Sequence, residues 1–200
     1  MLLHASDFLK DLIVAALDTG MRRRELLSLR WADVMFDAKA QPKAFMVAAE
    51  SAKTGRPRTV PVMSARLRTL LLRRRQGPNG KKLPSAALVF GNEVGESINN
   101  VKTAWRAACR RAKVAGLNFH DLRRECGSRW LEGRVGLLTV SALLGHTQVT
   151  TTNTYLASSP AVAEEELRAF EESRGNAFPN LSQTDAPNPS GVEKAETAVH

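Results

Sequence analysis

The spacing of apolar positions predicts a chain that is mostly helical. In several stretches apolar residues recur every three or four positions, which places them on one face of a helix. Ser6 is a candidate N-cap for the first helix, and Gly20 follows its predicted end. The stretches expected to be helical are residues 7–17, 22–29, 64–76, 99–114, 121–131, 137–144, 150–156 and 161–173.

Two short segments have the composition of strands. Residues 44–49 (AFMVAA) and 59–62 (TVPV) flank the sequence SAKTGRPR, which is rich in Gly, Pro and cations. This arrangement predicts a β-hairpin with an exposed tip, and residues 87–90 form a further brief strand or an extended link. The expected fold class is therefore α+β, mainly α with one small antiparallel β-sheet.

Composition is that of a folded chain, with 43% apolar and 24% charged residues among 200. The two cysteines, Cys109 and Cys126, are too few for a disulfide scaffold and are expected to be buried or half-buried thiols. The sequence contains no run of about 18 apolar residues, so it predicts no transmembrane helix. The first residues lack the basic start of a secretory signal, so we expect a cytoplasmic protein with no membrane partner.

Charge is unevenly distributed. The formal net charge is +9, but residues 161–200 hold eight acidic and three basic groups. Residues 1–160 therefore carry 26 basic and 12 acidic groups, a net charge of +14. A body this basic predicts a polyanionic partner, for which nucleic acid is the default.

Two segments place arginine where it can bind an anion. Arg22 follows the Gly20 turn at the start of a helix, with Glu25 one turn later, so its guanidinium can reach past the helix N-terminus. His120 and Arg123 lie three residues apart at another helix N-terminus, on one face of that helix.

Three other residues are unremarkable singly. Lys53 lies in the hairpin tip, where a lysine is usually solvated, and His146 follows a glycine, where a histidine is more often a helix cap. Tyr155, the single tyrosine of the chain, lies nine residues after His146. Together, however, the order TG-x-R, K-T-G, H-x-L-R and L-G-H-x8-Y resembles the tyrosine recombinase (phage integrase) family.

The resemblance covers residues 5–158, the catalytic domain of that family, and implies its fold. It also implies a set of catalytic residues, which in this chain are Arg22, Lys53, His120, Arg123, His146 and Tyr155. By the family's chemistry, the tyrosine attacks a DNA phosphodiester and forms a 3′-phosphotyrosine link that a 5′-hydroxyl later reverses. This reaction implies site-specific recombination or integration without a metal, a cofactor or a small-molecule substrate.

The same resemblance predicts the domain organisation and the partners. We expect a catalytic domain over residues 1–174, comprising the core 5–158 and an acidic helix 161–173, then a disordered tail over 175–200. No N-terminal core-binding domain is expected. The partner would be double-stranded DNA in the nucleoid, bound by a homo-oligomer that forms a synaptic tetramer, with the acidic helix packed on a neighbour or in cis.

The expected DNA contacts are Lys53, Arg56 and Arg58 on the hairpin and Arg124 beside the site, whereas residues 73–75 and 81–82 are expected to be solvated. Three alternatives remain at this point. Residues 140–156 can be interpreted as a helix–turn–helix of a non-catalytic DNA-binding module. The chain could also be a nickase similar to type IB topoisomerases, or an inactive remnant of a truncated integrase.

Overall fold

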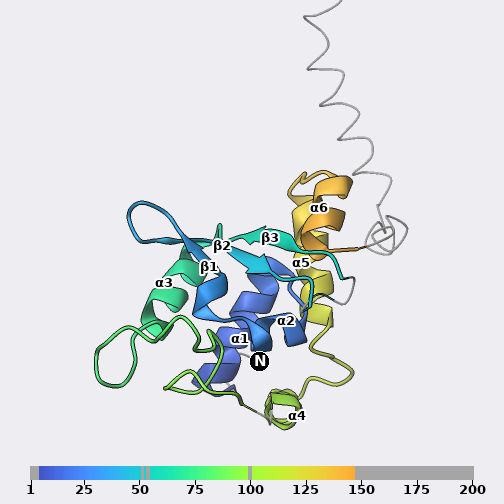
Figure 1. Cartoon of the computed structure of the whole chain (residues 1–200). Coiled ribbons are helices and arrows are strands. Elements are labelled where there is room, and N and C mark those ends of the chain that lie inside the picture. The colour runs from blue at the N-terminus through green and yellow to red at the C-terminus, as the bar shows by residue number, and fades with distance from the viewer. Residues whose placement is uncertain (1–4, 51, 53–54, 99–100, 147–200) are drawn as a thin grey trace, which may run out of the picture. The chain divides into compact units, whose positions relative to one another are not determined.

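The chain folds as predicted into helices around a small antiparallel sheet (Figure 1). The computed structural model describes residues 5–50, 52, 55–98 and 101–146; the expected helices over 150–156 and 161–173 and the tail 175–200 lie outside these residues. The helices are α1 (Asp7–Thr19), α2 (Arg23–Ser28), the 3₁₀ turn η2 (Trp31–Asp33), α3 (Ala65–Arg74), α4 (Val101–Arg111), α5 (Asp121–Glu132) and α6 (Leu137–Leu144).

Helix α1 shows how local chemistry sets the helix ends. The Ser6 hydroxyl accepts a hydrogen bond from the Leu9 amide at 3.4 Å, which caps the N-terminus as expected. The helix continues to Thr19, two residues beyond the prediction, and the Thr19 hydroxyl donates to the carbonyl of Ala15 at 2.6 Å. Gly20 then ends it with φ +60°, a left-handed conformation that glycine adopts without strain.

The predicted hairpin is present, and a third strand joins it. Strands β1 (Val34–Phe36), β2 (Pro42–Val47) and β3 (Arg58–Pro61) pair antiparallel in that order. Strand β2 starts and ends two residues earlier than expected because the chain turns after Val47, which pairs with Arg58. Strand β1 was not predicted, since three residues are too few to show alternation. Residues 87–90 form no strand and are mostly turn and bend. Leu88 makes one β-bridge with Arg30, and the Val89 amide donates to the carbonyl of Leu29 at 2.9 Å.

The hydrophobic core lies between the sheet and the helices. Leu9 and Leu12 of α1, Phe45 of β2 and Leu67 and Leu71 of α3 are completely buried. Helix α5 packs against α1, and α6 packs against β3 (Figure 1). This packing brings together the turn after α1, the start of α5, the end of α6 and the base of the hairpin.

Two further expectations concern single residues. Both cysteine thiols are buried, as expected. Residues 73–75, however, are not simply solvated. The Arg74 guanidinium donates to the carbonyl of Val89 at 2.7 Å and to the Asp11 carboxylate at 3.0 Å, while Arg75 lies 4.0 Å from the centroid of the Phe36 ring. Arginine can cover apolar surface with its stem while its head stays hydrogen-bonded, which the charge run alone does not reveal.

No helix among the described residues is long and apolar enough to cross a membrane.

Arg73 and Arg74 offer a matched test of burial, because both pair with Asp11 but their side chains are 62% and 14% exposed. We expect Arg74→Met to lower the free energy of unfolding by about 3 kcal/mol, since it leaves a buried carboxylate short of its partner. Arg73→Met should change it by no more than about 1 kcal/mol, because an exposed ion pair is screened by water. Urea unfolding of the two variants measures the difference, and equal losses would contradict it.

Candidate functional site

The first part of the site is the turn between α1 and α2. The Met21 amide donates to the Thr19 hydroxyl at 3.2 Å, and Gly20 turns the chain so that Arg22 becomes the N-cap of α2. Glu25, three residues on, accepts from the Arg22 amide at 2.8 Å through Oε2, which is the second half of a capping box. The turn therefore places the Arg22 side chain at a helix N-terminus, as the sequence predicts.

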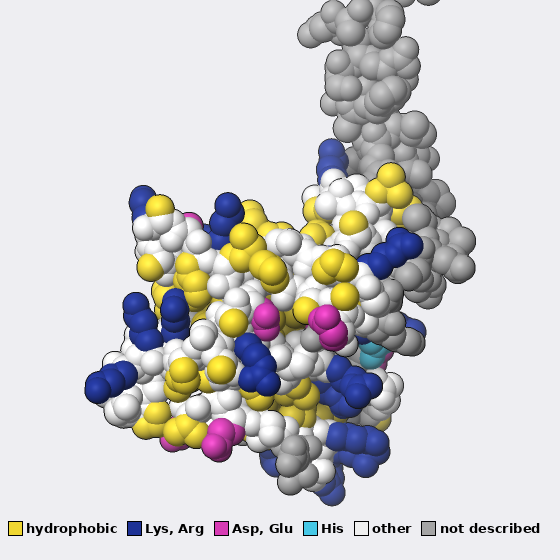
Figure 2. Space-filling view, viewed as in Figure 1, with side chains coloured by type: hydrophobic (Ala, Val, Ile, Leu, Met, Phe, Trp, Pro, Cys, Tyr) yellow, Lys and Arg dark blue, Asp and Glu magenta, His cyan; other side chains and the backbone are white. Residues whose placement is uncertain are grey.

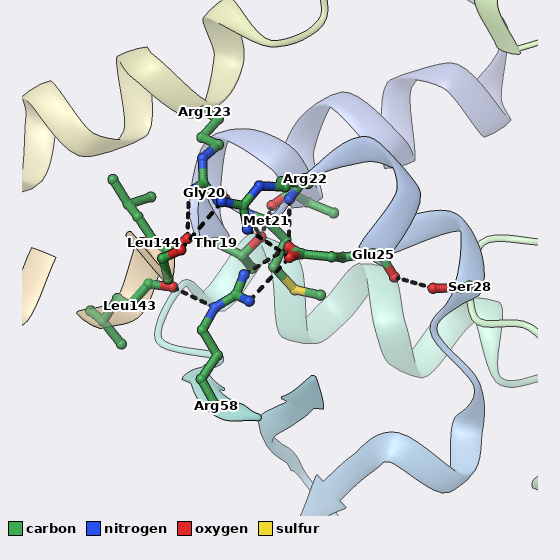
Figure 3. Close-up of polar contacts among 12 residues, drawn as sticks. Thr19, Gly20, Met21, Arg22, Glu25, Ser28, Arg58, Arg123, Leu143 and Leu144 are labelled. Carbon is green, nitrogen blue, oxygen red and sulfur yellow. Dashed lines mark hydrogen bonds and ion pairs between the residues drawn. The ribbon is translucent and has the colours of Figure 1, made fainter. Parts of the chain in front are cut away.

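Glu25 is the acceptor around which two guanidinium groups gather. Its side chain is 1% exposed. Besides the Arg22 amide, it accepts hydrogen bonds from Arg22 Nη1 at 3.0 Å and from Arg58 Nη1 and Nη2 at 3.1 and 2.7 Å (Figure 3). Burial alone would raise the pKa of this carboxyl, but the hydrogen bonds and charges of Arg58 and Arg22 outweigh it and lower the pKa.

The second part of the site is the C-terminal end of α6, where three consecutive carbonyl oxygens each accept from a different arginine. Leu143 accepts from Arg58 Nε at 2.9 Å. Leu144 accepts from Arg123 Nη2, and Gly145 accepts from Arg22 Nη2 at 3.2 Å. The last carbonyls of a helix lack partners within the helix and carry its negative dipole end, so cations are the partners they favour.

Arg123 joins the two parts. It stands in the first turn of α5, and the whole residue is only 2% exposed. Its Nη1 donates to the carbonyl of Gly20 at 2.7 Å, two residues before Arg22, while its Nη2 contacts Leu144. The residues expected to bind phosphate from two distant segments are therefore held at one place (Figure 3).

The two glycines of the sequence motifs are needed for close approach. Gly20 and Gly145 both have positive φ, +60° and +65°. A Cβ on Gly20 would lie 2.4 Å from Cδ2 of Leu144, and one on Gly145 would lie 3.1 Å from Nη1 of Arg58. The turn of the TG-x-R motif therefore packs against Leu144 at the end of α6, and the turn of the L-G-H motif packs against the Arg58 side chain.

The surroundings of the two candidate histidines lower the pKa of both imidazoles. Partial burial, followed by the charges of Arg123 and Arg22, lowers the pKa of His146 to about 4. Partial burial and the charges of Arg123 and Arg124 also lower the pKa of His120. Each imidazole is thus available as a neutral hydrogen-bonding group beside two permanently charged guanidiniums.

A pocket of about 820 Å³ opens over this cluster. Three of the expected catalytic residues line it: Arg22, His120 and Arg123. The segment that leads into the hairpin tip also lines it, through Glu50 and Ala52. The remaining lining residues are Met21, Arg23, Arg24, Glu25, Ser28, Asn118 and Phe119.

The other expected residues lie in different settings. Lys53 and Tyr155 are outside the described residues. Arg56 is exposed, and Arg124 is exposed with Nη1 3.5 Å from the Asp121 carboxylate. Arg58 differs from the exposed hairpin position that the sequence suggested: its side chain is 9% exposed because it reaches inward to Glu25 rather than outward to solvent.

The sequence suggests a DNA contact for Arg58 but not its inward ion pair with Glu25, and it relates Glu25 to Arg22 only through their helical spacing. The spacing of Glu25 from Arg22 carries a signal, because an acid three residues after an N-cap is typical of a capping box. Nothing in the sequence indicates that Arg58 points inward, since a strand residue can face either side of a sheet. Among the described residues, no cluster of His, Cys, Asp or Glu could hold a metal ion.

Comparisons with known proteins agree with the geometry. A sequence model described as the phage integrase family matches residues 5–161. A shufflon-specific DNA recombinase of Escherichia coli is 33% identical over 134 residues, which are 66% of this chain and 30% of the relative. A XerC-like tyrosine recombinase of Caldanaerobacter subterraneus is 31% identical over 172 residues, covering 72% of this chain and 44% of the relative.

The fold has a solved counterpart. The catalytic domain of bacteriophage HP1 integrase superposes with a TM-score of 0.59 at 22% identity, over 84% of this chain and 87% of that domain. The chain thus spans less than half the length of the two curated relatives but most of a domain of this type.

The lowered histidine pKa values predict how stability depends on pH. Because the pKa of His146 is about 4 in the folded protein and about 6.5 in an unfolded chain, the unfolded state binds more protons between these values. The stabilisation is complete above pH 6.5, is lost progressively as the pH falls below that value, and is gone once the pH has fallen through 4. We therefore expect His146→Asn to lose less stability than the wild type between pH 7 and pH 5 in urea unfolding. If the wild type and His146→Asn lost the same stability over this range, the lowered pKa of His146 would be wrong.

Proposed function

The chain belongs to the phage integrase family, and on that premise we propose that it breaks and rejoins DNA strands through a covalent 3′-phosphotyrosine intermediate. The observation that carries the proposal is the convergence of Arg22 and Arg123, 101 positions apart in sequence, with His120 on one pocket. A permanently charged, forked donor is the side chain best suited to a phosphodiester.

The proposed roles follow from the charge that develops during the reaction. The Tyr155 hydroxyl, whose reference pKa is about 10, gives up its proton with the help of His120 and attacks phosphorus. The pentacovalent state gains negative charge on its non-bridging oxygens. Arg22 and Arg123 stabilise that charge with bidentate hydrogen bonds, and His146 donates a further one.

Departure of the 5′-oxygen completes the first step. Lys53 protonates that oxygen as the bond from phosphorus to the 5′-oxygen breaks, while the bond from phosphorus to Tyr155 forms. Glu50 and Ala52 line the pocket, which supports a position for Lys53 near the reacting phosphate. A second 5′-hydroxyl then attacks the phosphotyrosine and releases Tyr155. One phosphoester replaces another in each step, so the proposed chemistry consumes no high-energy cofactor.

The partner we propose is double-stranded DNA in the nucleoid. Figure 2 shows many Lys and Arg side chains and few Asp and Glu on one face of the described residues. Arg56, Arg124 and Lys53 are the proposed phosphate contacts, and a synaptic tetramer is the proposed assembly. The proposed domain organisation is a catalytic domain over residues 1–174 followed by a tail over 175–200. Arg58 is not among these contacts, because its side chain is only 9% exposed and points toward Glu25.

Family membership favours this reaction over a plain DNA-binding module. In the helix–turn–helix interpretation, residues 140–156 would bind DNA without help from the rest of the chain. Instead, the end of α6 provides carbonyl acceptors to arginines from three other segments. Those contacts make it a part of the arginine cluster.

Covalent trapping tests the proposal. We expect a nicked suicide substrate, drawn from DNA flanking the gene, to yield a protein–DNA adduct on a denaturing gel in the presence of EDTA. Tyr155→Phe should abolish the adduct and leave salt-sensitive DNA binding intact, because only the attacking oxygen is removed. An adduct that persists in this variant would overturn the assignment of the nucleophile.

Wild-type protein that binds DNA but forms no adduct would contradict cleavage and favour a binding module or an inactive remnant. Supercoil relaxation without recombinant products would point to a nickase similar to type IB topoisomerases.

Arg22→Lys tests whether cleavage needs the two-point hydrogen bonding of the Arg22 guanidinium and not merely its charge. Lysine is a point charge that cannot span two phosphate oxygens. We expect the cleavage rate to fall about 100-fold while DNA affinity changes much less. The control is Arg66→Lys, which alters an exposed arginine paired with Asp18. Unchanged cleavage by Arg22→Lys in single-turnover assays would remove Arg22 from the proposed mechanism.

A further inference from the structure

We propose that Arg58 is a positioning residue for the phosphate site: it neutralises Glu25, so that this carboxylate can orient Arg22 without cancelling its charge. The inference rests on the proposed function, because it assumes that Arg22 binds the scissile phosphate. In this role Arg58 does not make the DNA contact that the sequence suggested. It acts through Glu25 on Arg22, which contacts the phosphate.

The charges around Glu25 give the first argument. An ion pair of Glu25 with Arg22 alone would be neutral, and a neutral pair attracts a phosphate weakly. The charge of Arg58 brings the group of three to a net charge of +1, to which Arg123 adds another. Because Glu25 is 1% exposed, water cannot supply this compensation, and a second cation must do so.

The hydrogen bonds give the second argument. Arg58 contacts both carboxylate oxygens, with Nη2 2.7 Å from Oε2 and Nη1 3.1 Å from Oε1. Each of these oxygens also accepts from Arg22, Oε2 from the amide and Oε1 from Nη1. A two-point fork fixes the plane of the carboxylate, and the carboxylate in turn fixes both the start of α2 and the Arg22 guanidinium (Figure 3).

The end of α6 gives a second route from Arg58 to Arg22. Arg58 Nε donates to the carbonyl of Leu143, and the position of a Cβ on Gly145 would lie 3.1–3.2 Å from Nη1, Cδ and Cζ of Arg58. The Gly145 peptide therefore rests on the Arg58 side chain. The Gly145 carbonyl accepts from Arg22 Nη2, and Glu25 accepts from Arg22 Nη1. Arg58 therefore supports both of these acceptors of the Arg22 guanidinium.

Arg58 also connects the site to the hairpin. It pairs with Val47 at the base of the hairpin whose tip contains Lys53. The neighbouring Arg56 is exposed, so the two arginines of the segment differ in role. One side chain thus ties the hairpin base, the end of α6 and the start of α2 to a common point.

A double-mutant cycle separates this role from a merely structural one. The proteins compared are the wild type, Arg58→Met, Glu25→Gln, the double variant Glu25→Gln/Arg58→Met and the control Arg66→Met. The first readout is the affinity for inorganic phosphate. It is measured in a titration that NMR monitors through the imidazole signals of His120 and His146. The second is the single-turnover rate of adduct formation. Thermal unfolding checks that each variant is folded.

We expect Arg58→Met to weaken phosphate binding and slow cleavage at least 10-fold, while Arg66→Met changes neither. The double variant should bind phosphate at least threefold more tightly than Arg58→Met, because the uncompensated carboxylate is gone. A structural role predicts the opposite, since the second substitution removes further hydrogen bonds. Wild-type phosphate affinity in Arg58→Met, or a double variant no better than Arg58→Met, overturns the proposal.

Arg58→Lys covers the case in which Arg58→Met does not fold. Lysine keeps the charge but cannot span both Glu25 oxygens and the Leu143 carbonyl, so we expect near-wild-type phosphate affinity with at least 10-fold slower cleavage. Phosphate affinity reduced as much as the cleavage rate would overturn the charge-balancing role. If the wild type forms no adduct, the proposed function fails, yet the phosphate titration of the cycle still decides the role of Arg58.

Discussion

The last carbonyl groups of α6 are the acceptors on which the rest of the site depends. No α-helix can satisfy its last carbonyls internally, and here Leu144 is buried while Leu143 and Gly145 are partly buried. Arg58, Arg123 and Arg22 supply the missing donors, one to each of three consecutive residues. Three like charges tolerate such proximity because the helix end and Glu25 provide the opposing charge.

This arrangement also explains why the site tolerates a buried carboxylate. Glu25 caps α2, orients Arg22 and receives the fork of Arg58, so each of its oxygens has two donors. A carboxylate with fewer partners would lose more by desolvation than it gains from attraction. The glycines at 20 and 145 make these contacts possible, since a methyl group at either position would meet a neighbouring side chain.

The sequence predicts the fold and the positions of Arg22, His120 and Arg123 because periodicity, caps and motif order are local signals. It misses β1 because Val34–Phe36 is too short to alternate and is held by pairing with β2. The sequence also does not predict the direction in which a side chain points. The sequence suggests a DNA contact for Arg58 and a solvated charge run for Arg74, but each side chain points toward a buried carboxylate whose position is set by a distant segment. Such partners become apparent only in three dimensions.

The separation of the contributing segments along the chain has a consequence for biosynthesis. The bond from Arg22 to Gly145 spans 123 residues, and that from Arg123 to Gly20 spans 103. During translation, the arginines at 22 and 58 leave the ribosome long before their acceptors on α6 exist. A partly made chain therefore has these arginines but not the carbonyl acceptors that gather them. The arginine cluster can form only when the α6 end has emerged and docked.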